Sequence, residues 1–223
     1  EEIVGKAARG RRDRLVIATK LGMKVGPDPE DEFTSPAAIT RQLDRSLGRL
    51  DTDYVDVYYL HKQDPGTPPE DIVRSMERAL KAGKIRAWAV SNHTAGQLEA
   101  LIAAADGLNM PRPVMCQPAL SLLKTDALAD MVPLCGREGI AVVPYQILQG
   151  GLLTGKYRRG RTAPAGSRMA EKPDWLWETD DALYTQLEQI EETAARMGLT
   201  MTQYAIRWVL AQPAVASAIV GVK

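Results

Sequence analysis

Short apolar runs alternate with amphipathic helical patterns along the chain, and this alternation limits the possible folds more than any other feature of the sequence. The runs are rich in Val and Ile and are broken by charge at no more than one position, which is typical of buried strands. They are LVIAT (15–19), VDVYYL (55–60), IRAWAV (85–90), PVMC (113–116), IAVVP (140–144) and ASAIV (216–220). Strands separated by helices predict a parallel sheet joined by right-handed crossovers.

The expected helices have recognisable start and stop residues. Ser35 and Pro36 can cap and open the first, Gly83 is placed to end the second, and Thr94 begins the third. Apolar residues then recur every three or four positions, as one buried helix face requires. The expected helices cover about 36–50, 70–82, 94–105, 126–135, 183–197 and 201–212.

Parallel strands with helices between them form either an open doubly wound sheet or a closed (β/α)8 TIM barrel. A nucleotide-binding open sheet usually carries a glycine-rich turn after its first strand, and GxGxxG does not occur in this chain. The α/β barrel is therefore favoured, with about six of its eight strands present. No linker or low-complexity tract divides the 223 residues, which indicates a single domain over residues 1–223.

Charge and cysteine content exclude several classes of function. The 28 basic residues balance the 28 acidic ones, so the overall field predicts neither nucleic acid nor an anionic membrane as partner. Cys116 and Cys135 lack CxxC spacing and a third partner, which argues against a disulfide framework or a metal site and favours buried thiols in a reducing cytoplasm. No apolar stretch reaches the roughly 18 residues of a membrane span.

Each apolar run is followed by a polar or aromatic residue, and in a parallel barrel such positions meet at the carboxyl ends of the strands. The residues are Lys20, His61, Ser91 with Asn92, Gln117, Tyr145, and Gly221 with Lys223. Taken singly, each has an ordinary alternative: a solvated lysine, a histidine bonded to a loop carbonyl, turn residues, or amphipathic residues at the edge of a core. Together they suit a flat polar ring stacked on Tyr145 and held at its edge by amides, beside a reacting oxygen.

The segment GGLLTGKY (150–157) matches only the first part of the phosphate-binding pattern GxxxxGK[ST]. Tyr157 stands where that pattern needs a hydroxyl for magnesium, and no suitable strand-to-helix unit surrounds it. We therefore exclude an ATPase and retain one inference. A glycine-rich loop that ends in Lys156 can approach phosphates.

The motifs LVIATKLG, VDVYYLHKQDP, AGKIRAWAVSNHTAGQL, VMCQPALSLL, VPYQILQGGLLTGKY and ASAIVG occur in the order found in the aldo-keto reductases. The chain resembles this family over essentially its whole length, and most closely its bacterial members related to potassium-channel beta subunits. The resemblance implies an NADPH-dependent oxidoreductase that passes hydride from nicotinamide to an aldehyde or ketone. It implies a small-molecule carbonyl substrate and leaves a homo-oligomer open.

The resemblance also implies roles for individual residues. Lys20 matches the lysine that lowers the pKa of a proton-donating tyrosine, and His61 matches the histidine that orients the carbonyl oxygen. The residues that match the family's nicotinamide site are Ser91, Asn92, Gln117 and Tyr145. Those that match its approach to the pyrophosphate and the adenosine phosphate are Gln146, Leu148, Lys156, Arg168, Gly221 and Lys223. Gln146 replaces the usual serine of a YSPL motif.

The family pattern DTADVYGxGxSEE, which carries the proton-donating tyrosine and its aspartate, has its counterpart before EEIVGKA, and the family's last helix would follow Lys223. We therefore expect a barrel that is incomplete at both ends. Three explanations stay open: the polypeptide is part of a longer protein, which is favoured because the remaining motifs form a working set; the gene is a truncated relative; or a partner chain completes the barrel. The alternative function is a catalytically impaired nucleotide-binding module that acts as a redox sensor or regulatory subunit.

Overall fold

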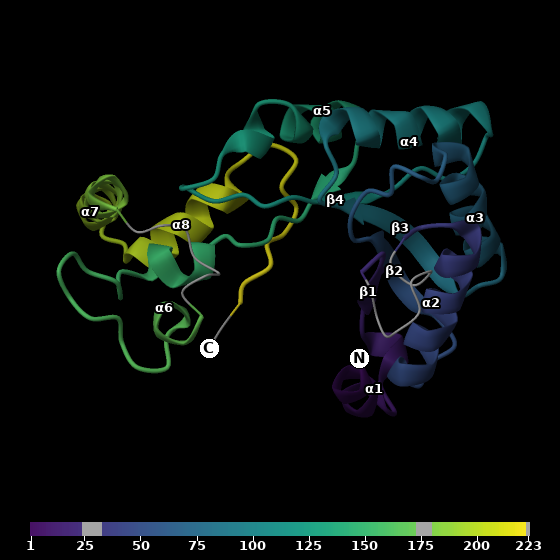
Figure 1. Ribbon diagram of the computed structural model, residues 1–223, viewed down its shortest axis with the longest axis horizontal. Helices are drawn as coiled ribbons and strands as arrows, with labels where there is room; N and C mark the ends of the chain where they lie inside the picture. Colours follow the sequence, from purple (N-terminus) through teal and green to yellow (C-terminus); the bar gives the residue numbers. More distant parts are fainter. Residues whose placement is uncertain (24–32, 173–179, 222–223) are drawn as a thin grey trace. The chain divides into compact units, whose positions relative to one another are not determined.

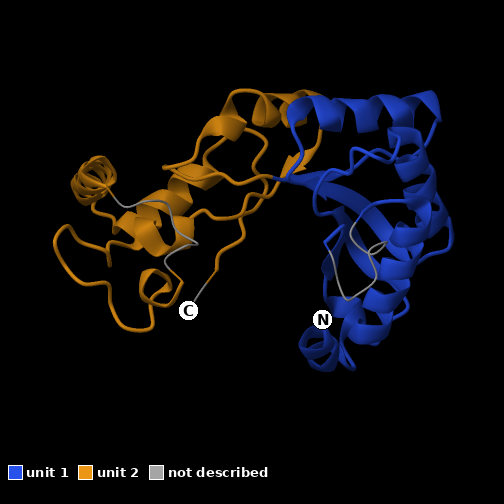
Figure 2. Cartoon of the chain, in the orientation of Figure 1, with its two compact units in different colours: residues 1–117 blue, residues 118–223 orange. Residues whose placement is uncertain are grey.

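The computed structural model describes residues 1–23, 33–172 and 180–221. The chain forms two compact units, Glu1–Gln117 and Pro118–Lys223 (Figure 2). The expectation of one barrel domain over residues 1–223 stays a prediction.

Unit 1 contains four parallel strands that pair in sequence order. They are β1 (Ala18–Leu21), β2 (Val55–Leu60), β3 (Ile85–Ser91) and β4 (Met115–Gln117). β2 is paired on both edges and its residues are almost entirely buried. This explains why all but one of its residues are apolar or aromatic, since a parallel strand between two neighbours meets protein on both faces.

Helices connect the strands of unit 1 and lie along one side of them (Figure 1). They are α2 (Pro36–Leu50), α3 (Pro69–Lys81) and α4 (Ala95–Gly107), preceded by α1 (Glu2–Ala8) and the 3-10 turn η1 (Arg12–Arg14). The predicted caps are present. Ser35 Oγ accepts the backbone N–H of Ala38, and Thr94 forms a reciprocal capping box with Gln97.

The two faces of the unit 1 sheet carry different side chains because successive strand residues point to opposite sides. Tyr58, on the helix side, is fully buried, and its hydroxyl donates to the backbone carbonyl of Ile39 in α2. Val57, Tyr59 and Ala89 form a second buried cluster on the opposite face. That second face carries the candidate site.

Unit 2 contains a second core built from helices and a glycine-rich turn. Its elements are η3 (Asp126–Leu128), α5 (Met131–Glu138), β5 (Ala141–Val142), η4 (Gln149–Thr154), α6 (Arg168–Glu171), α7 (Asp181–Arg196) and α8 (Met201–Leu210). Leu152 and Leu153 of η4 pack with Leu187 of α7 and Met201 of α8. The turn that carries GGLLTGKY is thereby fixed to the unit 2 core.

Several boundaries differ from the sequence prediction, and three of these differences are informative. β1 begins at Ala18, because Leu15 and Val16 follow the η1 turn and are exposed. The helix expected over 126–135 is split into η3 and α5, whose first residue follows the capping carboxylate of Asp130. The segment 216–220 is extended and donates backbone hydrogen bonds to Val142 and Pro144, but only Val215 forms a bridge, so it is not a strand.

A cluster of charged and aromatic side chains joins the amino ends of β1, β2 and β3. Asp56 accepts the backbone N–H of Ile17 at 2.8 Å and pairs with Arg12 at 2.8 Å and Arg86 at 3.5 Å. Both guanidinium groups lie over the ring of Tyr54, at 3.9 and 4.2 Å from its centroid. Burial alone would raise the pKa of Asp56, but the Ile17 hydrogen bond and the two arginines outweigh it and lower that pKa.

We predict that Asp56→Asn lowers the free energy of unfolding by about 2 kcal/mol, because it removes the acceptor charge from a largely buried pair. A carboxyl whose pKa is lowered in the folded state stabilises above its unfolded pKa of about 3.9 and loses that effect as the pH falls through the folded pKa. The difference between wild type and variant should therefore shrink in acid. Urea denaturation at neutral and acidic pH measures it.

The matched control is Asp44→Asn, which breaks the exposed pair between Asp44 and Lys84. Exposed pairs contribute about 0–1 kcal/mol, so this variant should stay close to wild type. Equal losses in the two variants at neutral pH would contradict the role given to Asp56.

Candidate active site

Strand register brings four of the predicted site residues to one face of the unit 1 sheet. Lys20 pairs with Tyr59, and Tyr59 pairs with Ala89. Ser91, two residues beyond Ala89, pairs with Gln117. Because side chains two residues apart share a face, Lys20, Ser91 and Gln117 lie on the same side as the position of His61, which directly follows β2. All four stand at or near the carboxyl ends of their strands, where barrel enzymes carry their sites.

Lys20 lies beside an aromatic ring rather than beyond the end of its strand. The sequence predicted it just after the apolar run, but it is the third residue of β1. Its Nζ is 5.5 Å from the ring centroid of Tyr59, within the range of a cation–π contact. The residue keeps exposed surface, yet the protein removes enough water from the ammonium group to lower its pKa.

His61 is half-buried, and its backbone is held on two sides. Its N–H donates to the carbonyl of Leu21 in β1 at 2.9 Å, and its carbonyl accepts the side-chain amide of Asn92 at 2.9 Å. Burial lowers the pKa of the imidazole first, and the positive charges of Lys20 and Lys62 lower it further. The ring is therefore neutral near pH 7 and carries one N–H that can donate to a carbonyl oxygen.

Asn92 holds His61 from a left-handed backbone conformation, with φ of 55°. Asn adopts this conformation more readily than most residues, because its short amide bonds locally. Here the side chain reaches across to the neighbouring strand end instead. The sequence predicted Asn92 at the site without predicting this link to His61.

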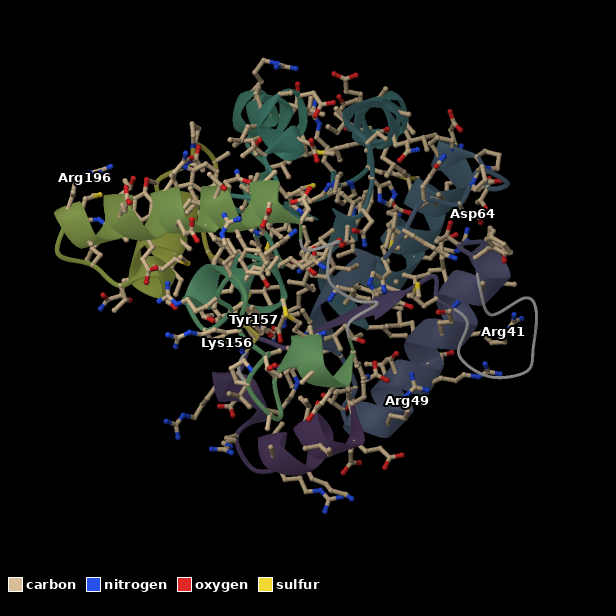
Figure 3. All side chains as sticks on the ribbon, turned by 60° about the vertical axis from the view of Figure 1, so that its left-hand side comes forward. Arg41, Arg49, Asp64, Lys156, Tyr157 and Arg196 are labelled. Atoms are coloured by element: carbon tan, nitrogen blue, oxygen red, sulfur yellow. The ribbon has the colours of Figure 1, made fainter. Side chains whose placement is uncertain are left out.

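Asp64 fixes the loop that follows His61, and sequence reasoning missed it. The carboxylate is buried and accepts hydrogen bonds from Gly66 N–H, the Thr67 hydroxyl and both the N–H and the hydroxyl of Thr34, at 2.7 to 3.3 Å. Burial would raise the pKa of Asp64, but these donors lower it. Figure 3 labels Asp64 within unit 1. The pattern DPGT, an acidic residue before a Pro-Gly turn, was the available signal.

Ser91 and Gln117 form a buried polar pair across β3 and β4. Ser91 Oγ donates to the backbone carbonyl of Gln117 at 2.9 Å, and both side chains are buried. Buried polar groups of this kind are held by their partners in one orientation. The pair offers hydroxyl and amide groups next to Lys20 and His61 on the same sheet face.

In unit 2, Tyr145, Gln146 and Leu148 lie on the chain that enters η4. Tyr145 forms a parallel bridge with Ala119 and keeps a partly exposed side chain. Gln146 is exposed with φ of 57°, which turns the chain sharply toward η4. Leu148 packs against the unit 2 core, so its side chain is partly used for packing.

Lys156 and Arg168 are linked through their neighbours in sequence. Tyr157 is buried, and its hydroxyl accepts the backbone N–H of Met169, the residue after Arg168. Lys156 and Tyr157 lie side by side (Figure 3), with Lys156 Nζ 5.4 Å from the Tyr157 ring centroid. Both cationic residues are exposed.

The glycines of this turn are required by its geometry. A Cβ on Gly151 would lie 2.7 Å from Lys156 Cε, and φ at Gly151 is 99°. A side chain there would therefore displace the lysine as well as strain the backbone. Gly221 is exposed, and Lys223 lies outside the described residues.

In the described part of the chain, no three or more His, Cys, Asp or Glu side chains are grouped as metal ligands would be. Among the same residues, no helix combines the length and the apolar character needed to cross a membrane.

The sequence model of the Aldo/keto reductase family matches residues 1–223. The chain belongs to this family. Aldo/keto reductases are oxidoreductases, and the α/β barrel predicted from the alternation of strands and helices is the fold of the family. Figure 1 shows the parallel strands and covering helices that this chain contributes to it.

The sequences of several relatives match this chain over almost its whole length. It is 36% identical to the probable voltage-gated potassium channel subunit beta of Arabidopsis thaliana, over 99% of this chain and 69% of that protein. It is 31% identical to the aldo-keto reductase YhdN of Bacillus subtilis (strain 168), over 96% of this chain and 63% of that protein. The glycerol dehydrogenase of Gluconobacter oxydans, a solved structure, matches with a TM-score of 0.80 at 29% identity, over 97% of this chain and 66% of that one.

The chain thus spans about two thirds of the length of these aldo/keto reductases. Members of the family generally use NAD(P)H. The polar pair of unit 1 suits the carboxamide of a nicotinamide, because Ser91 and Gln117 present a hydroxyl and an amide at neighbouring strand ends. The turn at Gly151 and Lys156 suits a phosphate, because Gly150 and Gly151 carry no side chain and Lys156 is an exposed cation.

We predict that Lys20→Met raises the pKa of His61. Lys20 and Lys62 both disfavour the imidazolium, and the charge of Lys20 has the larger effect on the pKa. NMR titration of the two histidines measures this directly. His93 is the internal control. Burial lowers the pKa of His93, and the bond to the Ser91 carbonyl offsets only part of this effect. Lys20 does not contribute to it.

Lys62→Met should also raise the pKa of His61, by less than Lys20→Met does. A His61 titration that does not respond to Lys20→Met would contradict the placement of these two side chains on one face.

Proposed function

We propose that the protein is an NADPH-dependent aldo/keto reductase that reduces an aldehyde or ketone to an alcohol and acts in the cytoplasm. The observation that carries the proposal is the shared sheet face of Lys20 and His61, where a cation lowers the pKa of a neutral imidazole. Family membership and the oxidoreductase names of several relatives support the same reaction class.

NADPH supplies the hydride when it is bound. On this proposal His61 donates its single N–H to the carbonyl oxygen of the substrate and stabilises the negative charge that develops there. One well-placed donor of this kind contributes about 3 kcal/mol in the transition state. Lys20 places a positive charge beside the proton-donating phenol of the family, which favours the phenolate and brings the phenol pKa toward neutrality.

The remaining predicted residues hold the cofactor on this proposal. Ser91, Asn92 and Gln117 bind the carboxamide, and Tyr145 stacks on the nicotinamide ring. The residues proposed to approach the pyrophosphate and the adenosine phosphate are Gln146, Leu148, Lys156, Arg168, Gly221 and Lys223. The exposure of Lys156 and Arg168 supports an electrostatic role, because their side chains can reach a charged ligand.

We expect Lys20→Met and His61→Ala, made in the natural full-length protein, each to lower turnover by about 100-fold or more with nearly unchanged cofactor affinity. The measurement is the loss of NADPH absorbance with a panel of aldehydes, ketones and quinones, together with cofactor titration. Lys84→Met is the matched control, because Lys84 pairs with Asp44 on the surface away from the site.

Weaker cofactor binding with unchanged turnover would reverse these two assignments. A wild-type protein that consumes no NADPH with any carbonyl in the panel would remove the reductase proposal.

Arg168→Ala tests the choice between NADPH and NADH. We expect its affinity for NADPH to fall about tenfold or more, with little change for NADH, because one charge-assisted contact to the additional phosphate contributes about 1.5–3 kcal/mol. Calorimetric titration with both nucleotides measures this. Arg161→Ala, an exposed arginine in the same segment, is the control and should change neither affinity.

A second candidate function is a nicotinamide-nucleotide-binding subunit that acts without turnover, as a redox sensor or regulatory subunit. The observation that favours it is the similarity to proteins named as potassium channel beta subunits, at 36% and 35% identity. Cofactor binding without carbonyl reduction by the full-length wild type would select this candidate. Turnover with any carbonyl would select the reductase.

A further inference from the structure

A cavity of about 260 Å³ lies in unit 1 between the loop 63–69 and the first two turns of α4, and we call it the α3–α4 cavity. Its floor is formed by Ile72 of α3 and Leu101 of α4, which are 5% and 3% exposed. These two helices are neighbours on the helix side of the sheet (Figure 1). None of the four site residues that share the opposite sheet face lines this cavity.

The loop that forms one wall of the α3–α4 cavity is held in a fixed shape. Asp64, labelled in Figure 3, accepts hydrogen bonds from the Thr67 hydroxyl at 2.7 Å and from the Gly66 N–H at 2.8 Å. Pro65 and Pro68 restrict the backbone further, because the proline ring fixes φ. A cavity with such walls is already formed before a ligand binds, so little conformational freedom is lost on binding.

His93 supplies a hydrogen-bond acceptor to the α3–α4 cavity. Its Nδ1 lies 2.8 Å from the backbone carbonyl oxygen of Ser91, and because a carbonyl can only accept, Nδ1 carries the proton of the neutral ring. Burial lowers the pKa of His93, so the ring is neutral near pH 7 and Nε2 is a lone-pair acceptor. Within the described residues Nε2 has no partner, and no unbonded side-chain nitrogen is sealed from solvent. Since His93 lines the cavity, Nε2 is the acceptor left there for a ligand.

A chain of amide hydrogen bonds leaves a donor at the same cavity. The backbone N–H of Thr94 donates to Gln97 Oε1 at 2.8 Å, so the NH2 group of Gln97 is the part that can donate. That NH2 group donates to Gln63 Oε1 at 2.5 Å. Gln63 therefore keeps its own NH2 group, to which no other part of the described chain is bonded. Both glutamines line the cavity.

These features define the chemistry of a matching ligand. The apolar floor and the prolines favour a flat hydrophobic ring, and apolar walls disfavour a charged group because they cannot replace its water. An apolar cavity of about 150 Å³ already holds benzene, so the α3–α4 cavity has room for one ring with small substituents. A hydroxyl on that ring supplies both complementary functions, a donor for His93 Nε2 and an acceptor for the Gln63 NH2 group.

We propose that the α3–α4 cavity binds a neutral, single-ring phenol whose hydroxyl donates to Nε2 of His93. This inference goes beyond the proposed function, because the cavity is separate from the residues given to the cofactor and the carbonyl. It nevertheless adjoins their support. Asn92, the residue before His93, bonds the carbonyl of His61, and the cavity wall begins at Gln63. A bound phenol therefore contacts the surroundings of His61 without occupying the reaction site.

The test compares two probes of similar shape, p-cresol and p-xylene, with the natural full-length protein. p-Xylene has a methyl group in place of the hydroxyl, so it can fill the cavity but cannot donate to Nε2. Affinities are measured by NMR titration, which does not depend on turnover. Wild type should bind p-cresol about tenfold more tightly than p-xylene. His93→Phe keeps a ring and removes Nε2, so it should abolish this preference while affinity for p-xylene stays nearly unchanged.

The nitrogen resonances of the histidines locate the bound probe. In wild type, p-cresol should shift the Nε2 resonance of His93, because a donor on the lone pair changes the shielding of that nitrogen, and p-xylene should shift it much less. His61 is the internal control, and its ring nitrogens should stay unchanged with both probes. A p-cresol-dependent shift at His61 in place of His93 would put the phenol at the candidate active site and overturn the inference.

Ala100→Leu provides a second test that leaves His93 in place, should His93→Phe fail to fold. Ala100 is an exposed residue of α4 that lines the cavity, so a leucine side chain there occupies part of it, and leucine is a good helix former. Both probes should bind about tenfold more weakly. Ala103→Leu is the matched control, because Ala103 is exposed on the same helix and does not line the cavity. It should leave both affinities as in wild type.

Absence of p-cresol binding, or equal affinity of wild type for the two probes, would overturn the inference. So would unchanged p-cresol binding in Ala100→Leu, since the probe would then lie elsewhere. None of these results involves NADPH, so each leaves the reductase proposal intact. Wild type that binds p-cresol as proposed and consumes no NADPH with any carbonyl would remove the reductase proposal alone.

Discussion

The in-register parallel pairing of β1 to β4 is the constraint on which the unit 1 site depends. Parallel pairing aligns strands that are far apart in sequence and gives each side chain a fixed face. Lys20, Ser91 and Gln117 become neighbours of the His61 position through this register. A shift of one residue in any strand would send its site residue to the helix side. The continuous burial of β2 and its two paired edges hold the register.

Much of this arrangement could be predicted from sequence because the signals are local and periodic. The apolar runs located all four strands of unit 1, and Ser35 and Thr94 marked two helix starts correctly. Lys20, His61, Ser91 and Gln117 were predicted to lie together because barrel strands end at one rim, and the strand register places them on one face. Boundaries were less accurate. Leu15 and Val16 are apolar, yet they precede the strand, because the η1 turn and the bond from Ile17 to Asp56 determine where β1 begins.

The contacts that support the site could not be predicted in the same way. Asn92 bonds the carbonyl of His61, and Asp64 bonds Thr34, across separations of about 30 residues. Such bonds depend on where two loops meet in space, which no local pattern encodes. Tyr59, whose ring lies beside the Lys20 ammonium, was overlooked for a related reason. It belongs to an apolar run that predicts only burial, whereas its hydroxyl is directed by Met115 on another strand.

The Asp56 cluster lies at the opposite end of the strands from Lys20 and His61, since Asp56 is near the start of β2 and His61 follows its end. Structural support and chemistry are thus separated along the same four strands. Such a division leaves the loops around the site open to evolutionary change, because a new loop sequence need not disturb the Asp56 cluster at the other end of the strands. The same property makes this scaffold suitable for loop grafting, in which the Asp56 cluster is kept constant and the loops at the carboxyl ends of the strands are varied.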